Sequence, residues 1–312
     1  MVCFSPLRVY RGRRYNPATG KKSVFFSPRN TFTDKDAFLI PCGRCEGCRL
    51  AKSYEWSLRC VAESKYHNES YFLTLTYDPD SLPSDRCLCR AHFQSFMKRL
   101  RWHFRNYKLR VFYCGEYGSD RHRPHYHAII FGLPLSKENI SLFPLNYSKR
   151  GNPNYYSPLL NEIWGKGLVT VGSCNDKTCA YVAQYTLKKL KDLSPLQRSV
   201  PPFVGCSNRP AIGLQYFLDF HKEILSRCCF QPDSSSHPFP IPRYYLKVAE
   251  REFPLLWFSK YELPRRLKNY RDWLMKKLDP EKYAELIDNK LKIRYYKERI
   301  LFRRLRKRLD ML

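Results

Sequence analysis

The sequence predicts an α+β protein built on a ferredoxin-like (RRM-like) antiparallel sheet with helices on one face. Strand-like segments rich in β-branched and aromatic residues recur between residues 71 and 171, and segments of helical periodicity separate them. Their order is β-α-β-β-α-β, followed by one more helix, which is the ferredoxin-like arrangement. A small Cys-rich segment precedes this domain, and a basic helical region follows it.

The elements are expected in the following order along the chain. Strands are expected at 71–77, 109–114, 125–131 and 168–171, and helices at 49–67, 93–104, around 155–165, and at 176–190. The last helix begins with Asp176 and ends in lysines, as the helix dipole favours. Residues 1–40 show few periodic segments, so no regular element is assigned to them.

Three regions are expected: a basic N-terminal region with a Cys cluster at 1–65, the α+β domain at 66–228, and a Pro-rich linker with a basic helical region at 229–312. A basic run near the end is either a DNA-backbone contact or a solvated helical face. Its cations are Arg303, Arg304, Arg306, Lys307 and Arg308.

The charge of the chain predicts a polyanionic partner. There are 56 Lys and Arg residues against 28 Asp and Glu, a formal net charge of +28, and 15% of residues are aromatic. Cations neutralise phosphates and aromatic rings stack on bases, so nucleic acid is favoured over a membrane surface or an acidic protein. No apolar stretch is long enough for a membrane span or a signal peptide, so a cytoplasmic location is expected.

Two histidines mark a candidate metal site. His125 and His127 are two residues apart on an expected strand, so their side chains share a face and can share a cation. Glu116 ends the preceding strand and is the candidate third ligand, for Mg²⁺ or Mn²⁺. The alternatives are two incidental histidines, and a Glu116 that pairs with Arg121 or Arg123.

Two tyrosines mark a candidate nucleophile site. Tyr181 and Tyr185 are four residues apart on an expected helix, so their rings share a face. A phenol is a weak nucleophile near neutral pH, and Lys188 is the cation expected to assist it. The alternative is an aromatic pair that packs on the sheet.

The spacing of Cys42, Cys45 and Cys48 is typical of thiolate ligands to zinc or an iron–sulfur cluster. Free thiols are the alternative. Structural zinc is favoured, with Cys3 assigned as the fourth ligand, although Cys60 is also a candidate and the sequence does not decide between them.

These motifs resemble those of a known family. FLTLTYD at 72–78, GEYG and RPHYHAIIFG within 115–132, and AYVAQYTLKK at 180–189 resemble the three motifs of the HUH endonucleases, in their two-tyrosine initiator branch. MVCFSP, PCGRCEGCR, SYEW and LTLTYD are more closely similar to replication initiators of small icosahedral single-stranded DNA phages, the gokushoviruses. The resemblance covers roughly residues 1–225.

The resemblance implies that His125, His127 and Glu116 bind the catalytic metal. It implies that Tyr181 and Tyr185 are nucleophiles: one nicks the origin and becomes linked to the 5′-phosphate, and the freed 3′-hydroxyl primes synthesis. The other cleaves the regenerated origin after one round, and the displaced strand is rejoined into a circle. Origin DNA, a host polymerase, a host helicase and a single-strand-binding protein are the expected partners, in the cytoplasm of a bacterial host.

One residue departs from the family pattern. A lysine often follows the first tyrosine by three residues, and Gln184 stands there in this chain. Lys188 keeps that relation to Tyr185, which favours Tyr185 as the better-supported nucleophile. A transposase or plasmid relaxase with the same chemistry, and a non-enzymatic binder of single-stranded nucleic acid, are the alternative functions.

Overall fold

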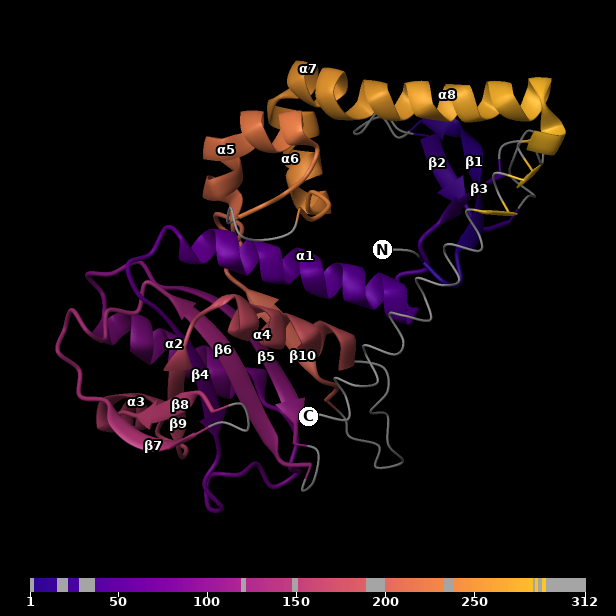
Figure 1. Cartoon of the computed structure of the whole chain (residues 1–312). Helices are drawn as coiled ribbons and strands as arrows, with labels where there is room; N and C mark the ends of the chain where they lie inside the picture. Colours follow the sequence, from indigo (N-terminus) through magenta and orange to yellow (C-terminus); the bar gives the residue numbers. More distant parts are fainter. Residues whose placement is uncertain are drawn as a thin grey trace. The chain divides into compact units, whose positions relative to one another are not determined.

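The computed structural model describes residues 3–15, 22–27, 37–118, 122–147, 151–188, 200–232, 238–282, 284–285 and 288–289. At 11, 13–15, 22, 184–188, 269, 273–274 and 276 it describes the backbone alone. The chain divides into two compact units, of which the first comprises mainly residues 3–220 and the second mainly residues from 221 onward (Figure 1).

The first unit contains a seven-stranded sheet in the order β10-β5-β6-β4-β9-β8-β7, and every neighbouring pair is antiparallel. The strands are β4 (Ser70–Thr76), β5 (Arg110–Tyr117), β6 (Pro124–Phe131), β7 (Phe143–Tyr147), β8 (Pro153–Tyr156), β9 (Val169–Ser173) and β10 (Phe203–Cys206). The four expected strands are β4, β5, β6 and β9, which lie side by side. The α+β class and the antiparallel sheet are therefore confirmed, while β7, β8 and β10 extend the sheet beyond the expectation.

Helices cover both faces of this sheet, so the expectation of helices on one face is wrong (Figure 1). On one face lie α2 (Arg90–His103) and α3 (Pro158–Trp164), and on the other lie α1 (Glu46–Ser64) and α4 (Asp176–Lys188). The reason is that β6 is apolar on both faces: Ile129 packs in the core with α1 and α4, and Ile130 packs in the core with α2. A strand buried on both sides needs a cover on both sides.

A second, three-stranded sheet lies near the N-terminus, where no regular element was expected. It consists of β1 (Leu7–Tyr15), β2 (Lys22–Phe25) and β3 (Ala37–Ile40) in the order β2-β1-β3, and both pairs are antiparallel. The strands are short or rich in arginine, so their hydrophobic alternation is weak in the sequence. In the β1–β3 pair, Leu7 lies opposite Ile40.

Helices make up the regular structure described after the large sheet. They are α5 (Leu214–Arg227), α6 (Arg243–Glu252), α7 (Pro254–Trp257), a π-helical turn at Phe258–Glu262, and α8 (Leu263–Leu278). A helical region was expected here, and the described part of it is helical. Within the described residues, no helix combines the length and the apolar composition that crossing a membrane requires. The basic run at 303–308 lies outside the described residues.

Candidate active site

Strand pairing brings the candidate metal ligands together. On β5, Glu116 lies directly opposite His125 of β6, and on the other side of β6, Thr74 of β4 lies opposite His127. Because alternate residues of a strand face the same side, His125 and His127 share the sheet face that α1 and α4 cover. The central position of β6 therefore gives its two histidines a polar neighbour on each side.

The three side chains converge on one carboxylate oxygen. Glu116 Oε1 lies 3.0 Å from His125 Nε2 and 3.2 Å from His127 Nε2. One donor atom of each of the three residues lies within 4.8 Å of the other two. Burial raises the pKa of the Glu116 carboxyl, but the two histidines outweigh it and lower that pKa to about 2. The carboxylate is therefore anionic throughout the physiological range.

The other ring nitrogens of the histidines have partners as well. His125 Nδ1 lies 3.1 Å from the carbonyl oxygen of Arg123, and since a carbonyl only accepts, Nδ1 carries the proton. His127 Nδ1 lies 3.0 Å from Thr74 Oγ1. Contacts of this kind fix the ring orientation and leave Nε2 as the ligand nitrogen. Two imidazole nitrogens and a carboxylate are thus a donor set that fits a divalent cation.

The site opens to solvent on the side of His125. Its side chain is 17% exposed, against 8% for each of His127 and Glu116. A phosphate group can therefore approach past His125, whereas the other two ligands are held inside the fold. Glu116 contacts the two histidines, so the alternative in which it pairs only with an arginine is not what the structure shows.

Tyr181 lies beside this site. Its ring centroid is 5.5 Å from that of His127, at an interplanar angle of 77°, and 5.9 Å from that of Phe72. Phe72 in turn stacks on His127 at 5.6 Å. The backbone of Tyr185 and Lys188 lies on α4 as expected, but their side chains lie outside the described part of the structure.

Two contributors to the site, Thr74 and Phe72, were not singled out in the sequence. Both belong to the FLTLTYD segment, on alternate positions of β4, and therefore face the same side as His127. The alternation of this segment, with the histidine strand as a neighbour, was the available signal. Only the pairing of β4 with β6 turns that signal into a contact.

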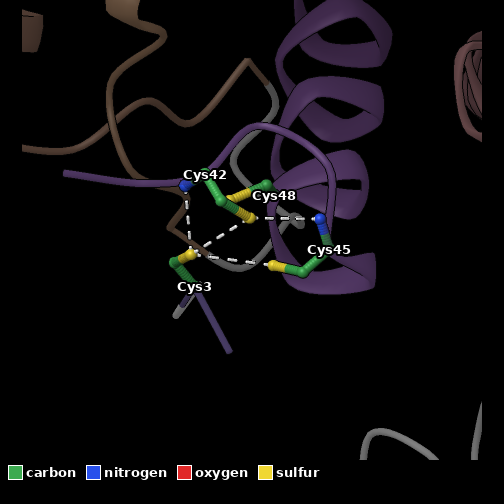
Figure 2. A group of neighbouring side chains, drawn as sticks. All are labelled: Cys3, Cys42, Cys45 and Cys48. Carbon is green, nitrogen blue, oxygen red and sulfur yellow. Dashed lines mark hydrogen bonds between the residues drawn. The ribbon is translucent and has the colours of Figure 1, made fainter. Parts of the chain in front are cut away.

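The four candidate zinc ligands also gather. Cys3, Cys42, Cys45 and Cys48 each offer a sulfur within 4.8 Å of the other three (Figure 2). Cys60, the other candidate for the fourth position, is instead fully buried in the core between α1 and the sheet. The structure therefore groups Cys3, and not Cys60, with the other three.

Comparisons with known proteins agree with these motifs. Residues 70–190, which contain the histidine strand and the whole of α4, match a family model described as replication-associated protein ORF2. The chain is 30% identical over 287 residues to a replication-associated protein ORF2 of Spiroplasma virus 4, which covers 86% of each chain. It is 30% identical over 283 residues to a replication-associated protein VP4 of Bdellovibrio phage phiMH2K, which covers 86% of this chain and 83% of the relative.

A third relative is a replication-associated protein ORF4 of Chlamydia phage 1. It is 31% identical over 223 residues, which cover 69% of this chain and 54% of the relative. No solved structure matches the chain.

Proposed function

The chain belongs to the family of phage replication-associated proteins, and on that premise we propose that it starts rolling-circle replication as a metal-dependent nicking and joining enzyme. The observation that carries this proposal is the convergence of His125 Nε2 and His127 Nε2 on Glu116 Oε1, with the ring of Tyr181 against His127. A ligand set and a phenol side by side are the parts that a phosphotyrosine transfer needs.

In this proposal His125, His127 and Glu116 hold one Mg²⁺ or Mn²⁺ ion. When bound, the ion supplies a Lewis acid that polarises the scissile phosphate. The contacts of the histidines with Thr74 and with the Arg123 carbonyl keep both rings oriented with Nε2 toward the ion. The anionic Glu116 reduces the net charge of the site, which leaves the ion able to release a phosphate after the reaction.

Tyr181 is the nucleophile that the described side chains support. Its phenol oxygen attacks the scissile phosphorus, a new bond forms between the tyrosine oxygen and the 5′-phosphate, and the bond to the 3′-oxygen breaks. The tyrosine proton leaves to solvent or a base, and the 3′-oxygen takes up a proton and becomes the primer end. The phosphotyrosine bond conserves the phosphodiester energy, so the reverse reaction rejoins the strand without ATP.

Tyr185 and Lys188 complete the proposal. Tyr185 follows Tyr181 by one helical turn on α4, which suits a second nucleophile that acts after one round of synthesis. Lys188 ends the same helix and supplies a cation near the second phenol. The displaced strand is then released as a circle, when the free 3′-hydroxyl attacks the first phosphotyrosine.

The proposed substrate is origin DNA, single-stranded or locally unwound. The net charge of +28 supports a polyanionic substrate. A host helicase, a host polymerase and a host single-strand-binding protein would unwind the duplex, extend the 3′ end and cover the displaced strand. The setting proposed for this reaction is the cytoplasm of the bacterial host.

The proposal is tested by an adduct assay with labelled single-stranded oligonucleotides spanning the phage origin. We expect a covalent protein–DNA adduct with Mn²⁺ or Mg²⁺ and none with a chelator, and mass spectrometry should identify the labelled peptide as residues around Tyr181 or Tyr185. The His127→Ala variant should lower the adduct rate more than about 100-fold, since loss of a ligand costs at least as much as loss of its supporting contact.

Matched tyrosine variants separate chemistry from folding. Tyr181→Phe and Tyr185→Phe together should abolish the adduct, whereas Tyr147→Phe should retain it, because Tyr147 is 76% exposed on an edge strand. An adduct that persists in the double variant would refute the assignment. Salt-sensitive DNA binding with no adduct under any metal condition would favour the non-enzymatic alternative.

A further inference from the structure

The four cysteines of Figure 2 come from two separate places in the chain. Cys3 precedes β1, and the other three follow β3 or lie in the first turn of α1. Because β1 and β3 pair antiparallel, with Leu7 opposite Ile40, the start of one strand and the end of the other lie together. Strand pairing therefore brings Cys3 to the C-x-x-C-x-x-C segment.

The sulfur spacing matches four ligands on one ion. Cys3 Sγ lies 3.6 Å from Cys42 Sγ and 3.7 Å from Cys45 Sγ. A zinc–sulfur bond of about 2.3 Å sets the edge of the sulfur tetrahedron at about 3.8 Å. A disulfide has its sulfurs at about 2.05 Å, and all four cysteines are free thiols. In an iron–sulfur cluster each thiolate binds a different iron, so its sulfurs must stand further apart than these do.

Backbone N–H groups point at the sulfurs. Cys42 Sγ accepts from the N–H groups of Arg44 and Cys45, at 3.4 and 3.2 Å. Cys3 Sγ accepts from the N–H of Cys42 at 3.2 Å, and Cys45 Sγ from that of Phe4 at 3.3 Å. Such donors favour thiolates over thiols, because they stabilise negative charge on sulfur.

The local backbone is shaped for this arrangement. Gly43 has φ +71°, a left-handed conformation that few other residues adopt, and it turns the chain between Cys42 and Cys45. Cys45 is the N-cap of α1 and Cys48 lies in its first turn, so both sit at the positive end of the helix dipole. A cluster of thiolates is stabilised there by the same field that favours other anions.

The small sheet has little apolar core of its own. Val9 is fully buried and Tyr10 is 9% exposed, but Leu7, Val24, Phe26 and Leu39 are 40–68% exposed. A sheet of three short strands with so few buried side chains gains little from the hydrophobic effect. Small folds of this kind commonly depend on a metal ion or disulfides for their stability.

We propose that Cys3, Cys42, Cys45 and Cys48 bind one structural Zn²⁺ ion as four thiolates, and that this ion fastens the β2-β1-β3 sheet to the start of α1. The site lies apart from the histidine–carboxylate site and does not depend on the proposed nicking reaction. All four positions are filled by protein sulfur, which leaves no open position for a substrate and marks the site as structural.

The test uses the full-length protein, purified with zinc present, in metal analysis and thiol counting. The wild type and Cys228→Ser should retain a thiolate-bound zinc ion, and Cys3→Ser and Cys45→Ser should each contain one equivalent less. Cys228 is the matched control, because it is exposed and lies outside the cluster. Removal of zinc by a chelator should make four more thiols reactive in the wild type, whether or not the variants fold.

Cobalt distinguishes the two candidate metal sites. Co²⁺ added to the zinc-free protein should produce a sulfur-to-cobalt charge-transfer band that is absent in Cys45→Ser and present in His127→Ala. Zinc retained in full by Cys3→Ser and Cys45→Ser, or no change in thiol reactivity on chelation, would overturn the proposal. Iron and acid-labile sulfide in the purified protein would overturn it in favour of a cluster.

Discussion

The contact between Thr74 and His127 yields a prediction about metal affinity. Thr74→Val removes the hydroxyl 3.0 Å from His127 Nδ1 and keeps the shape of the side chain. Without metal, the ring proton can sit on Nε2 and face Glu116, but a bound ion occupies Nε2 and requires the proton on Nδ1. The substitution therefore costs more in the metal-bound form than in the free form.

The size of the effect follows from the burial of the ring. The His127 side chain is 8% exposed, so an unsatisfied N–H there costs about 1–3 kcal/mol. At 1.4 kcal/mol per factor of ten, the Mn²⁺ concentration for half-maximal adduct formation should rise about 10- to 100-fold, as for other supporting contacts of metal ligands. The rate at saturating Mn²⁺ should change little, because no ligand is lost.

Thr76→Val is the matched control for this titration. Thr76 lies on the same face of β4, two residues further on, but its hydroxyl donates to the carbonyl of Leu168 at 3.1 Å. Its Mn²⁺ midpoint should stay close to that of the wild type. An unchanged midpoint in Thr74→Val, or equal shifts in both variants, would show that the Thr74 contact does not support the ligand.

Two further predictions concern stability. Glu63→Gln should lower the free energy of unfolding by about 3–5 kcal/mol in a denaturant titration at pH 7, because it leaves the buried Arg110 guanidinium without its ion-pair partner. Burial raises the Glu63 pKa, but His67 and Gly213 outweigh it and hold that pKa below 4.5, so the contribution is present above pH 4.5 and falls as the pH drops through the lowered value. An equal gap between variant and wild type at pH 7 and in strong acid would contradict this. Gly167→Ala should destabilise by about 1–3 kcal/mol, since φ is +136° and a Cβ would lie 2.5 Å from a backbone oxygen, whereas Gly165→Ala, with 3.4 Å, should lower the melting temperature less.

The sequence predicted the central elements well, for a physical reason. β4, β6 and α2 have strong hydrophobic patterns because each is packed against the core, and their bounds differ from the expected ones by at most a few residues. The β1–β3 sheet and the edge strands were missed because exposed, arginine-rich or very short strands carry weak alternation. The second covered face was missed because burial on both sides of β6 was interpreted only as a central position.

The candidate site shows the same division. The two histidines and the carboxylate were found from residue type and spacing, since a strand fixes which side chains share a face. The contacts of Thr74 and Tyr181 with His127 depend on which strand neighbours β6 and on how α4 packs over the sheet. These are tertiary facts, and no spacing along the chain encodes them directly. Cys3 was distinguished from Cys60 for the same reason.

The helix α1 connects the cysteine cluster with the helix that carries the tyrosines. It has 19 residues and hence a length of about 28 Å. Its first turn holds Cys48, while Val61 near its other end packs in one core with Val182 of α4. A rigid helix keeps its two ends at a fixed distance and a fixed angle. A ligand that reorients the small N-terminal sheet would therefore have to move α1, and with it the surface on which Tyr181 is held against the metal ligands.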